Sequence, residues 1–158
     1  MTELVIDPEL DLVLERWVPV PADKVWRAWT TPALLEQWFC PRPWRAAEFE
    51  IDLRPGGAYN CTMFGPGGEV MPNRGCVLQV IPGRRLVTTD ALTAGFRPTG
   101  SGFLTAYWTV ETDRDGARYV AVAKHATTEA VKQHEQMGFR DGWSTALTQL
   151  VELMQRTP

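Results

Sequence analysis

The sequence predicts an α+β domain in which a curved antiparallel sheet of about six to seven strands wraps around a long C-terminal helix. Three observations lead to this fold class. Residues 46–125 alternate between apolar and polar side chains and are interrupted by glycine-rich turns, which is typical of antiparallel strands. Residues 127–154 carry apolar side chains at helical spacing. Two short helical segments follow the first strand, separated at a residue that precedes a proline.

The N-terminal part begins with one strand and two short helices. Leu12–Val18 alternates with period two and ends at a proline-rich turn. Helical segments are expected at Ala22–Thr30 and Pro32–Phe39, separated at Thr31 because the residue before a proline is pushed out of helical conformation. Trp26 and Trp29 are three residues apart, so we expect them to pack the first short helix against the core.

The middle of the chain reads as an antiparallel meander. Glycine-rich turns such as Arg54–Gly57 supply the positive φ angles that hairpins require. Ala91–Gly102 is expected to be a connecting loop that either is merely mobile or gates a cavity through Phe96. The strands are expected at Ala46–Leu53, Ala58–Phe64, Val70–Ile81, Arg85–Asp90, Phe103–Thr112 and Arg118–His125.

The last element is expected to be one long amphipathic helix. It begins near Thr127 or Thr128, either of which can cap it, and runs to about Met154. Gly138 and Gly142 lie inside it, and each costs about 1 kcal/mol relative to alanine in a helix interior. We therefore expect another backbone or a ligand to approach these glycines closely.

Composition places the chain among ordinary globular domains and excludes several partners. It has 158 residues, of which 44% are hydrophobic, so we expect a single domain over 1–158 with its core in 9–156. With 16 Lys+Arg against 19 Asp+Glu and no basic run, neither nucleic acid nor a membrane surface is the expected partner. The three cysteines form no CxxC pair and the N-terminus has no leader-like pattern, which favours the cytoplasm.

Three motifs in order suggest a known family. They are residues 21–32 (PADKVWRAWTTP), 52–57 (DLRPGG) and 134–143 (HEQMGFRDGW). Together they resemble the START-like superfamily, also called SRPBCC or Bet v 1-like, and specifically the family similar to the activator of the 90-kDa heat-shock protein ATPase. The resemblance covers nearly the whole chain. It implies a helix-grip fold with a hydrophobic cavity, related to the birch pollen allergen and to polyketide cyclases, but it implies no single activity.

Aromatic residues are the strongest support from composition for a ligand cavity. Five of the seven tryptophans lie between Trp17 and Trp44, where short helices and loops would form the mouth of the cavity. The cavity is expected between the sheet and the C-terminal helix. Its expected walls are Trp38, Phe39, Trp44, Tyr59, Cys61, Met63, Leu78, Phe96, Trp108, Phe139 and Trp143.

Few residues suit acid–base chemistry, and His125, Arg16 and Tyr59 are the ones to test. His125 either hydrogen-bonds the start of the last helix or acts as a general base. His134 and Asp141 are seven residues apart, which predicts a solvated pair on a polar helix face. Arg16 lies on the same face of its strand as the apolar residues, so its side chain is expected to point inward. There it would need a buried carboxylate partner or would bind an anion. The carboxylates considered are Glu48, Glu50 and Asp52.

The sequence therefore predicts a domain that binds a small apolar ligand. Two alternatives stay open: an enzyme of the polyketide cyclase type that uses the same cavity, and an interaction protein that stimulates a chaperone ATPase. No metal site is expected, because residues 134–138 (HEQMG) lack the second histidine of the zinc helix motif. No cofactor is implied, and the protein is expected to be a monomer or a homodimer.

Overall fold

The computed structural model describes residues 4–158. Among these residues, no helix has both the length and the apolar character needed to cross a membrane. The elements in chain order are β1 (Asp11–Val18), α1 (Ala22–Thr30), α2 (Pro32–Trp38), β2 (Arg45–Ile51), β3 (Tyr59–Phe64), β4 (Val70–Asn73), β5 (Cys76–Ile81), β6 (Arg85–Thr89), β7 (Leu92–Thr93), β8 (Arg97–Pro98), β9 (Thr105–Asp113), β10 (Gly116–Lys124), α3 (Thr128–Gln136) and α4 (Phe139–Gln155).

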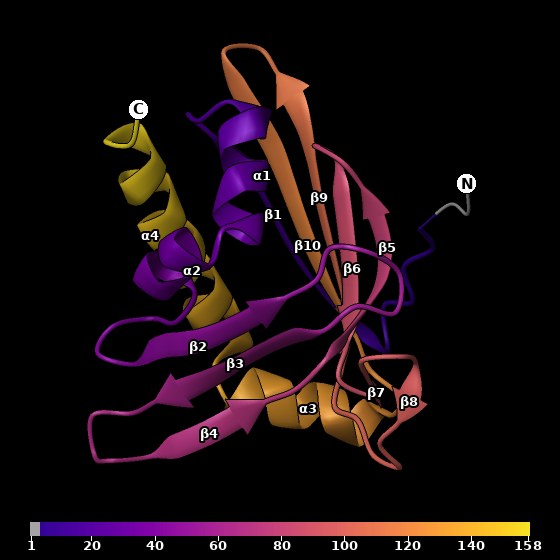
Figure 1. The fold of residues 1–158 in the computed structure, drawn as a ribbon. Helices are drawn as coiled ribbons and strands as arrows, with labels where there is room; N and C mark the ends of the chain where they lie inside the picture. The colour runs from indigo at the N-terminus through magenta and orange to yellow at the C-terminus, as the bar shows by residue number, and fades with distance from the viewer. Residues whose placement is uncertain (1–3) are drawn as a thin grey trace.

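The strands form two main antiparallel sheets. One has the order β1-β10-β9-β6-β5 and the other β2-β3-β4, and a single bridge between Ala58 and Cys76 links them. Helices α1, α2 and α4 pack against one another on one side of the five-stranded sheet, while α3 lies below it near the β7-β8 hairpin (Figure 1). The predicted α+β fold with an open antiparallel sheet around the C-terminal helix is confirmed.

The main core lies between the five-stranded sheet and the helices. On the sheet side, Leu86 and Val110 are fully buried, in register with the predicted alternation of β6 and β9. On the helix side, Leu147, Leu150 and Met154 form the apolar face of α4. Each fully buried side chain of this size contributes about 1.5–3 kcal/mol relative to an exposed one, so this face holds α4 on the sheet.

One predicted strand is interrupted. The alternation over Val70–Ile81 predicts a continuous strand, but the chain turns at Gly75 and passes from one sheet to the other. The Gly75 amide donates to Asn60 Oδ1 at 3.0 Å, and a Cβ there would lie 2.9 Å from the Thr89 carbonyl oxygen. Only glycine fits so close to a neighbouring backbone, which is why the strand breaks at this residue.

The expected long helix is also interrupted, so it is wrong as a single element. Thr127 caps α3 as predicted, its Oγ1 accepting from the Ala130 amide at 3.1 Å. The chain then breaks at Gly138, which has φ of 89° and precedes α4. Gly138 therefore serves a left-handed turn. The expected close approach at Gly142 is also wrong, because a Cβ there would meet only Pro41 Cγ, at 3.9 Å.

Replacing Gly138 or Gly142 with alanine is expected to change the stability in opposite directions. Gly142→Ala should raise the free energy of unfolding by about 0.5–1 kcal/mol, because alanine has the higher helix propensity and the site has room. Gly138→Ala should lower it by about 1–2 kcal/mol, because an L-residue is strained at positive φ. Urea unfolding of both variants measures these changes. Destabilisation by Gly142→Ala would contradict the open surroundings of that residue.

Candidate ligand-binding site

Aromatic side chains from distant parts of the chain meet on the inner face of the sheet. Trp29 of α1 lies 5.8 Å from Trp108 of β9 and 5.5 Å from Tyr119 of β10, measured between ring centroids. Tyr59 of β3 lies 5.9 Å from Trp108, and Phe39 lies 6.2 Å from it. We call these five residues the central aromatic cluster. Tilted and edge-to-face contacts of this kind each add about 0.5–1.5 kcal/mol beyond burial.

The polar atoms of the central aromatic cluster bond to one another. Trp29 Nε1 donates to the Tyr119 hydroxyl at 3.3 Å, and the Tyr59 hydroxyl donates to the Trp29 carbonyl oxygen at 2.9 Å. Burial raises the pKa of Tyr119 to about 12 and raises that of Tyr59 well above its usual value. Tyr59, proposed from the sequence as a group to test for chemistry, therefore stays protonated near neutral pH and ties β3 to α1.

A smaller apolar cluster adjoins this one between α2 and β3. Its buried members are Cys40, Ala46 and Cys61. Burial raises the pKa of the Cys40 thiol to about 11 and that of Cys61 to about 12, so both are protonated and unreactive near neutral pH. We call it the cysteine cluster; the half-buried side chains packed on it are Phe39, Trp44, Phe49 and Met63.

Phe49 is a wall residue that the sequence did not reveal. Strict alternation from buried Ala46 would point Glu48 inward and Phe49 outward. A β-bulge between Ala47 and Glu50, with Glu48 at φ of 58°, reverses this order. Phe49 then faces inward and lies 5.7 Å from Phe39. The bulge has no glycine to mark it, so the sequence gives no local signal.

Nine of the eleven expected wall residues belong to these interior clusters or pack at the α3–α4 junction. Trp38, Cys61, Trp108 and Phe139 are buried. Phe39, Trp44, Tyr59, Met63 and Trp143 are half-buried. The two best-defined surface hollows among residues 4–158 both lie away from the space between the sheet and α4. The structure thus brings these residues together in contact with one another.

Leu78 does not belong to this group. β5 has a bulge between Val77 and Gln79, and Leu78 is left unpaired there. As a result Val77, fully buried, enters the main core, whereas Leu78 is only half-buried. The predicted inward orientation of Leu78 is wrong, because the extra residue shifts the alternation by one.

Phe96 lies on the outside of the molecule. It is 50% exposed, at φ of 58°, in the β7-β8 hairpin that forms within the expected loop. Its ring lies against Gly56, where a Cβ would come within 2.7 Å of Phe96 Cε2. Together with the Arg54–Gly57 turn it lines an open hollow of about 480 Å³. Phe96 is therefore not a wall of the space between the sheet and α4.

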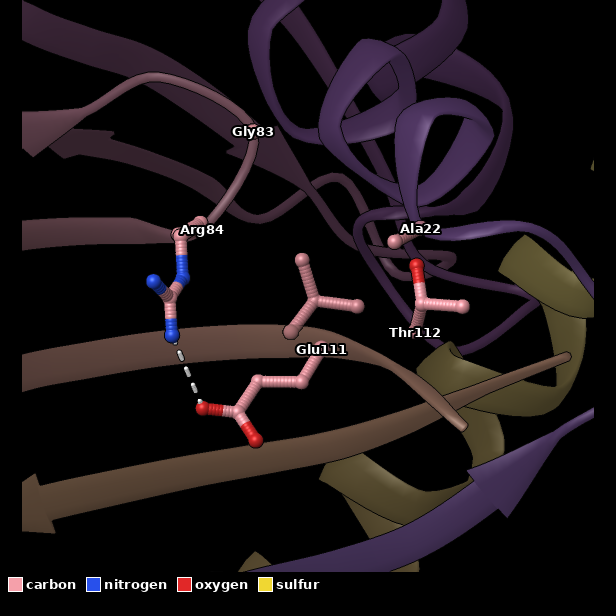
Figure 2. A pocket seen from close by; sticks show the side chains of 6 residues that line it. Ala22, Gly83, Arg84, Glu111 and Thr112 are labelled. Carbon is pink, nitrogen blue, oxygen red and sulfur yellow. Dashed lines mark hydrogen bonds and ion pairs between the residues drawn. The ribbon is translucent and has the colours of Figure 1, made fainter. Parts of the chain in front are cut away.

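A second hollow, of about 360 Å³, lies where the β5-β6 turn meets the end of β9 and the start of α1. The side chains of Arg84 and Glu111 point toward each other across it (Figure 2), and Arg84 Nη2 lies 3.1 Å from Glu111 Oε1. Both side chains are more than half exposed, so this pair contributes little to stability. The hollow is a shallow feature of the surface.

Arg16 faces α4, as the alternation of its strand predicts, but no carboxylate within residues 4–158 pairs with it. Its Nη2 donates to the Ser144 carbonyl oxygen at 2.7 Å and to Ser144 Oγ at 3.1 Å. Its Nη1 donates to Thr148 Oγ1 at 3.0 Å. The expected ion pair with Glu48, Glu50 or Asp52 is therefore wrong. Arg16 instead fastens β1 to α4 through hydroxyl and carbonyl oxygens.

The two histidines form a contact that the sequence did not predict. His125 Nε2 lies 2.9 Å from His134 Nδ1, and both residues are buried. The expected solvated pair of His134 and Asp141 is wrong, because the break at Gly138 changes the helical phase between them. If α3 and α4 formed one continuous helix, His134 would lie on its polar face, and this is why the sequence predicts a solvated histidine. No group of three His, Cys, Asp or Glu residues within 4–158 has the arrangement of a metal site.

The sheet around a C-terminal helix, the two short helices after β1 and the apolar inner face define a helix-grip domain. The chain belongs to the family described as "Activator of Hsp90 ATPase homolog 1-like protein", whose model matches residues 19–155. No curated protein sequence matches the chain.

Solved structures share the fold over nearly the whole chain. Protein NE0264 from Nitrosomonas europaea is 44% identical, with a TM-score of 0.93 over 96% of this chain and 97% of that one. Protein Ms6760 from Mycobacterium smegmatis is 26% identical, with a TM-score of 0.80 over 99% of both chains. The family and fold are therefore established, and the function has to be argued from the site.

Proposed function

We propose that this chain is a small-molecule-binding domain that holds a hydrophobic or aromatic ligand between the inner face of the sheet and helices α3 and α4. The observation that carries the proposal is an apolar wall that the fold leaves partly uncovered. Phe39, Tyr59 and Trp143 pack against the main core but are only half-buried. Rigid aromatic side chains of this kind are typical walls of small-molecule pockets.

Small residues on the sheet support the same proposal. Ala106 of β9 pairs with Ala123 of β10, and Ala121 pairs with Trp108. These three alanines occupy the inner face at positions where larger residues would fill the space below α3 and α4. Of the three, Ala123 belongs to the same apolar cluster as Phe139, with Trp143 packed on it, so a ligand that displaced these rings would meet a small side chain on the sheet.

Binding of an uncharged fluorescent probe, N-phenyl-1-naphthylamine, tests the proposal. We expect the protein to bind it, and Trp143→Ala to weaken the binding about tenfold, which is about 1.4 kcal/mol and matches the loss of one aromatic contact. Trp17→Ala is the matched control, because Trp17 is also half-buried but its Nε1 donates to the Asp113 carbonyl oxygen on the outer side of the sheet. The control variant should bind the probe as the wild type does.

Native mass spectrometry of the purified protein adds an independent measurement. A small molecule that stays bound under gentle conditions and is released on denaturation would support the proposal and identify the ligand class. An empty protein that also takes up no probe would overturn it. The same spectra give the subunit count, which decides between a monomer and a homodimer.

The alternatives differ in what supports them. A polyketide cyclase type of activity lacks a free catalytic group among the residues considered, since Tyr59, Arg16 and His125 each hydrogen-bond to the fold itself. Stimulation of a chaperone ATPase is supported only by membership of the family. We therefore place ligand binding first, with the cytoplasm as the expected compartment.

A further inference from the structure

The His125–His134 pair is anchored at one end by a backbone carbonyl. His125 follows the last residue of β10, and its Nδ1 lies 2.9 Å from the Leu10 carbonyl oxygen. The His125 amide donates to the same oxygen at 3.0 Å. On the other side of the ring, His125 Nε2 lies 2.9 Å from Nδ1 of His134, which is only 6% exposed. The two rings therefore form a chain of hydrogen bonds that starts at Leu10.

This chain fixes where the protons are. A carbonyl oxygen can only accept, so His125 Nδ1 carries the proton and donates to Leu10. In a neutral imidazole the other nitrogen then has a lone pair, so His125 Nε2 accepts from His134 Nδ1. His134 Nδ1 therefore carries its proton, and His134 Nε2 is left as an acceptor. Burial, followed by the nearby His125, lowers the pKa of His134 to about 4, so the ring is neutral near pH 7.

The free nitrogen of His134 lies among aromatic rings. The centroids of Phe103, Phe139 and Trp143 are 5.0, 5.1 and 5.9 Å from that of His134. His134 Nε2 makes no hydrogen bond to a residue within 4–158, and no fully buried side-chain nitrogen or oxygen there lacks a partner. Nε2 therefore still meets solvent. A solvent-accessible lone pair between aromatic rings is suited to a ligand that carries a hydrogen-bond donor.

We propose that His134 Nε2 is the polar anchor of the ligand site and selects an aromatic ligand with a hydroxyl group, such as a phenol. This inference rests on the proposed function and names the ligand class for it. The hydroxyl donates to Nε2 while the aromatic body packs on Trp143. A carboxylate is disfavoured, because an anion would face a lone pair. His125 acts as a positioning residue that fixes the tautomer of His134.

Three naphthalene probes of similar size test the selection. We expect 2-naphthol, which has a hydroxyl donor, to bind about tenfold more tightly than 2-methoxynaphthalene, which has none, and 2-naphthoate to bind more weakly than 2-naphthol. In His134→Phe, which keeps a ring of similar size, the two uncharged probes should bind equally. Fluorescence titration measures all three affinities.

Nitrogen-15 NMR of the wild-type histidine side chains tests the tautomer without any variant, so the inference remains testable if His134→Phe does not fold. We expect both rings to be protonated at Nδ1, and the His134 Nε2 signal to shift when 2-naphthol is added. Protonation of His134 at Nε2, or equal affinity of the wild type for 2-naphthol and 2-methoxynaphthalene, would overturn the inference and leave the proposed function standing. If none of the three naphthalene probes binds and N-phenyl-1-naphthylamine does not bind either, both the inference and the proposed function are overturned.

Discussion

Replacing Trp29 with alanine is expected to lower the free energy of unfolding by about 3–5 kcal/mol, the usual range for deleting a large buried aromatic side chain. Trp29 is fully buried, and its ring contacts those of Trp26, Trp108 and Tyr119. Its removal leaves a cavity between α1 and the sheet. It also leaves the Tyr119 hydroxyl without the donor that it has at 3.3 Å. Both effects destabilise the same interface.

Urea unfolding followed by circular dichroism measures the change. Trp29→Phe keeps one six-membered ring but loses the second ring of the indole with its Nε1 donor, so it should destabilise the protein less than the alanine variant, by about 1–3 kcal/mol, and remains measurable if that variant does not fold. Phe96→Ala is the control on an exposed aromatic residue and should change stability by less than about 0.5–1 kcal/mol. A loss below about 1 kcal/mol in Trp29→Ala would contradict the central place of Trp29 in the core.

The sequence predicted the fold because its strongest patterns are also the ones that determine packing. Alternation in Thr105–Asp113 directs Ala106, Trp108 and Val110 inward, as the structure confirms. The apolar face of the last helix, with Leu147 and Leu150, is likewise where the spacing places it. Such patterns extend over many residues, so a local irregularity does not hide them.

Features that depend on a single residue were not predictable in the same way. The bulges near Glu48 and Leu78 each insert one residue and reverse the faces of the residues next to them, which concealed Phe49 and misplaced Leu78. Gly75 breaks a strand because neighbouring backbones approach it, and that approach is a tertiary contact. The sequence marks Gly138 as costly within a helix, but the left-handed turn that explains this glycine exists only because the helix ends there.

The sequence predicted which aromatic residues come together at the candidate site, but it did not predict how the polar side chains there hydrogen-bond. Aromatic content suggested where walls would form, and most of the expected wall residues do lie together. The His125–His134 contact joins the end of β10 to α3 through ring nitrogens, and no spacing in the sequence encodes such a contact. Arg16 faces the core side as its parity indicates, yet its partners are Ser144 and Thr148, far along the chain.

The protein is expected to lose stability as the pH falls from about 6.5 to about 4, by about 2–3 kcal/mol from His134 alone. The pKa of His134 is lowered to about 4 in the folded state, first by burial and then by the nearby His125. In the unfolded chain the same group has its ordinary pKa of about 6.5. Between these values the unfolded state binds one more proton than the folded state, so acid favours unfolding. The contribution levels off about one pH unit above 6.5 and about one unit below 4, where the two states bind the same number of protons.

His134→Gln isolates this contribution from that of the carboxylates, which are the same in both proteins. Glutamine does not titrate and its amide can still donate to His125 Nε2, so the variant should show a shallower fall in stability over this pH range. Urea unfolding at intervals between pH 7 and pH 4 gives the two slopes, whose difference should approach about 1.4 kcal/mol per pH unit. Proton NMR of the wild-type ring then assigns the effect. If His134 titrates near its ordinary pKa, or if the two slopes are equal, the burial of a neutral His134 at this junction is contradicted.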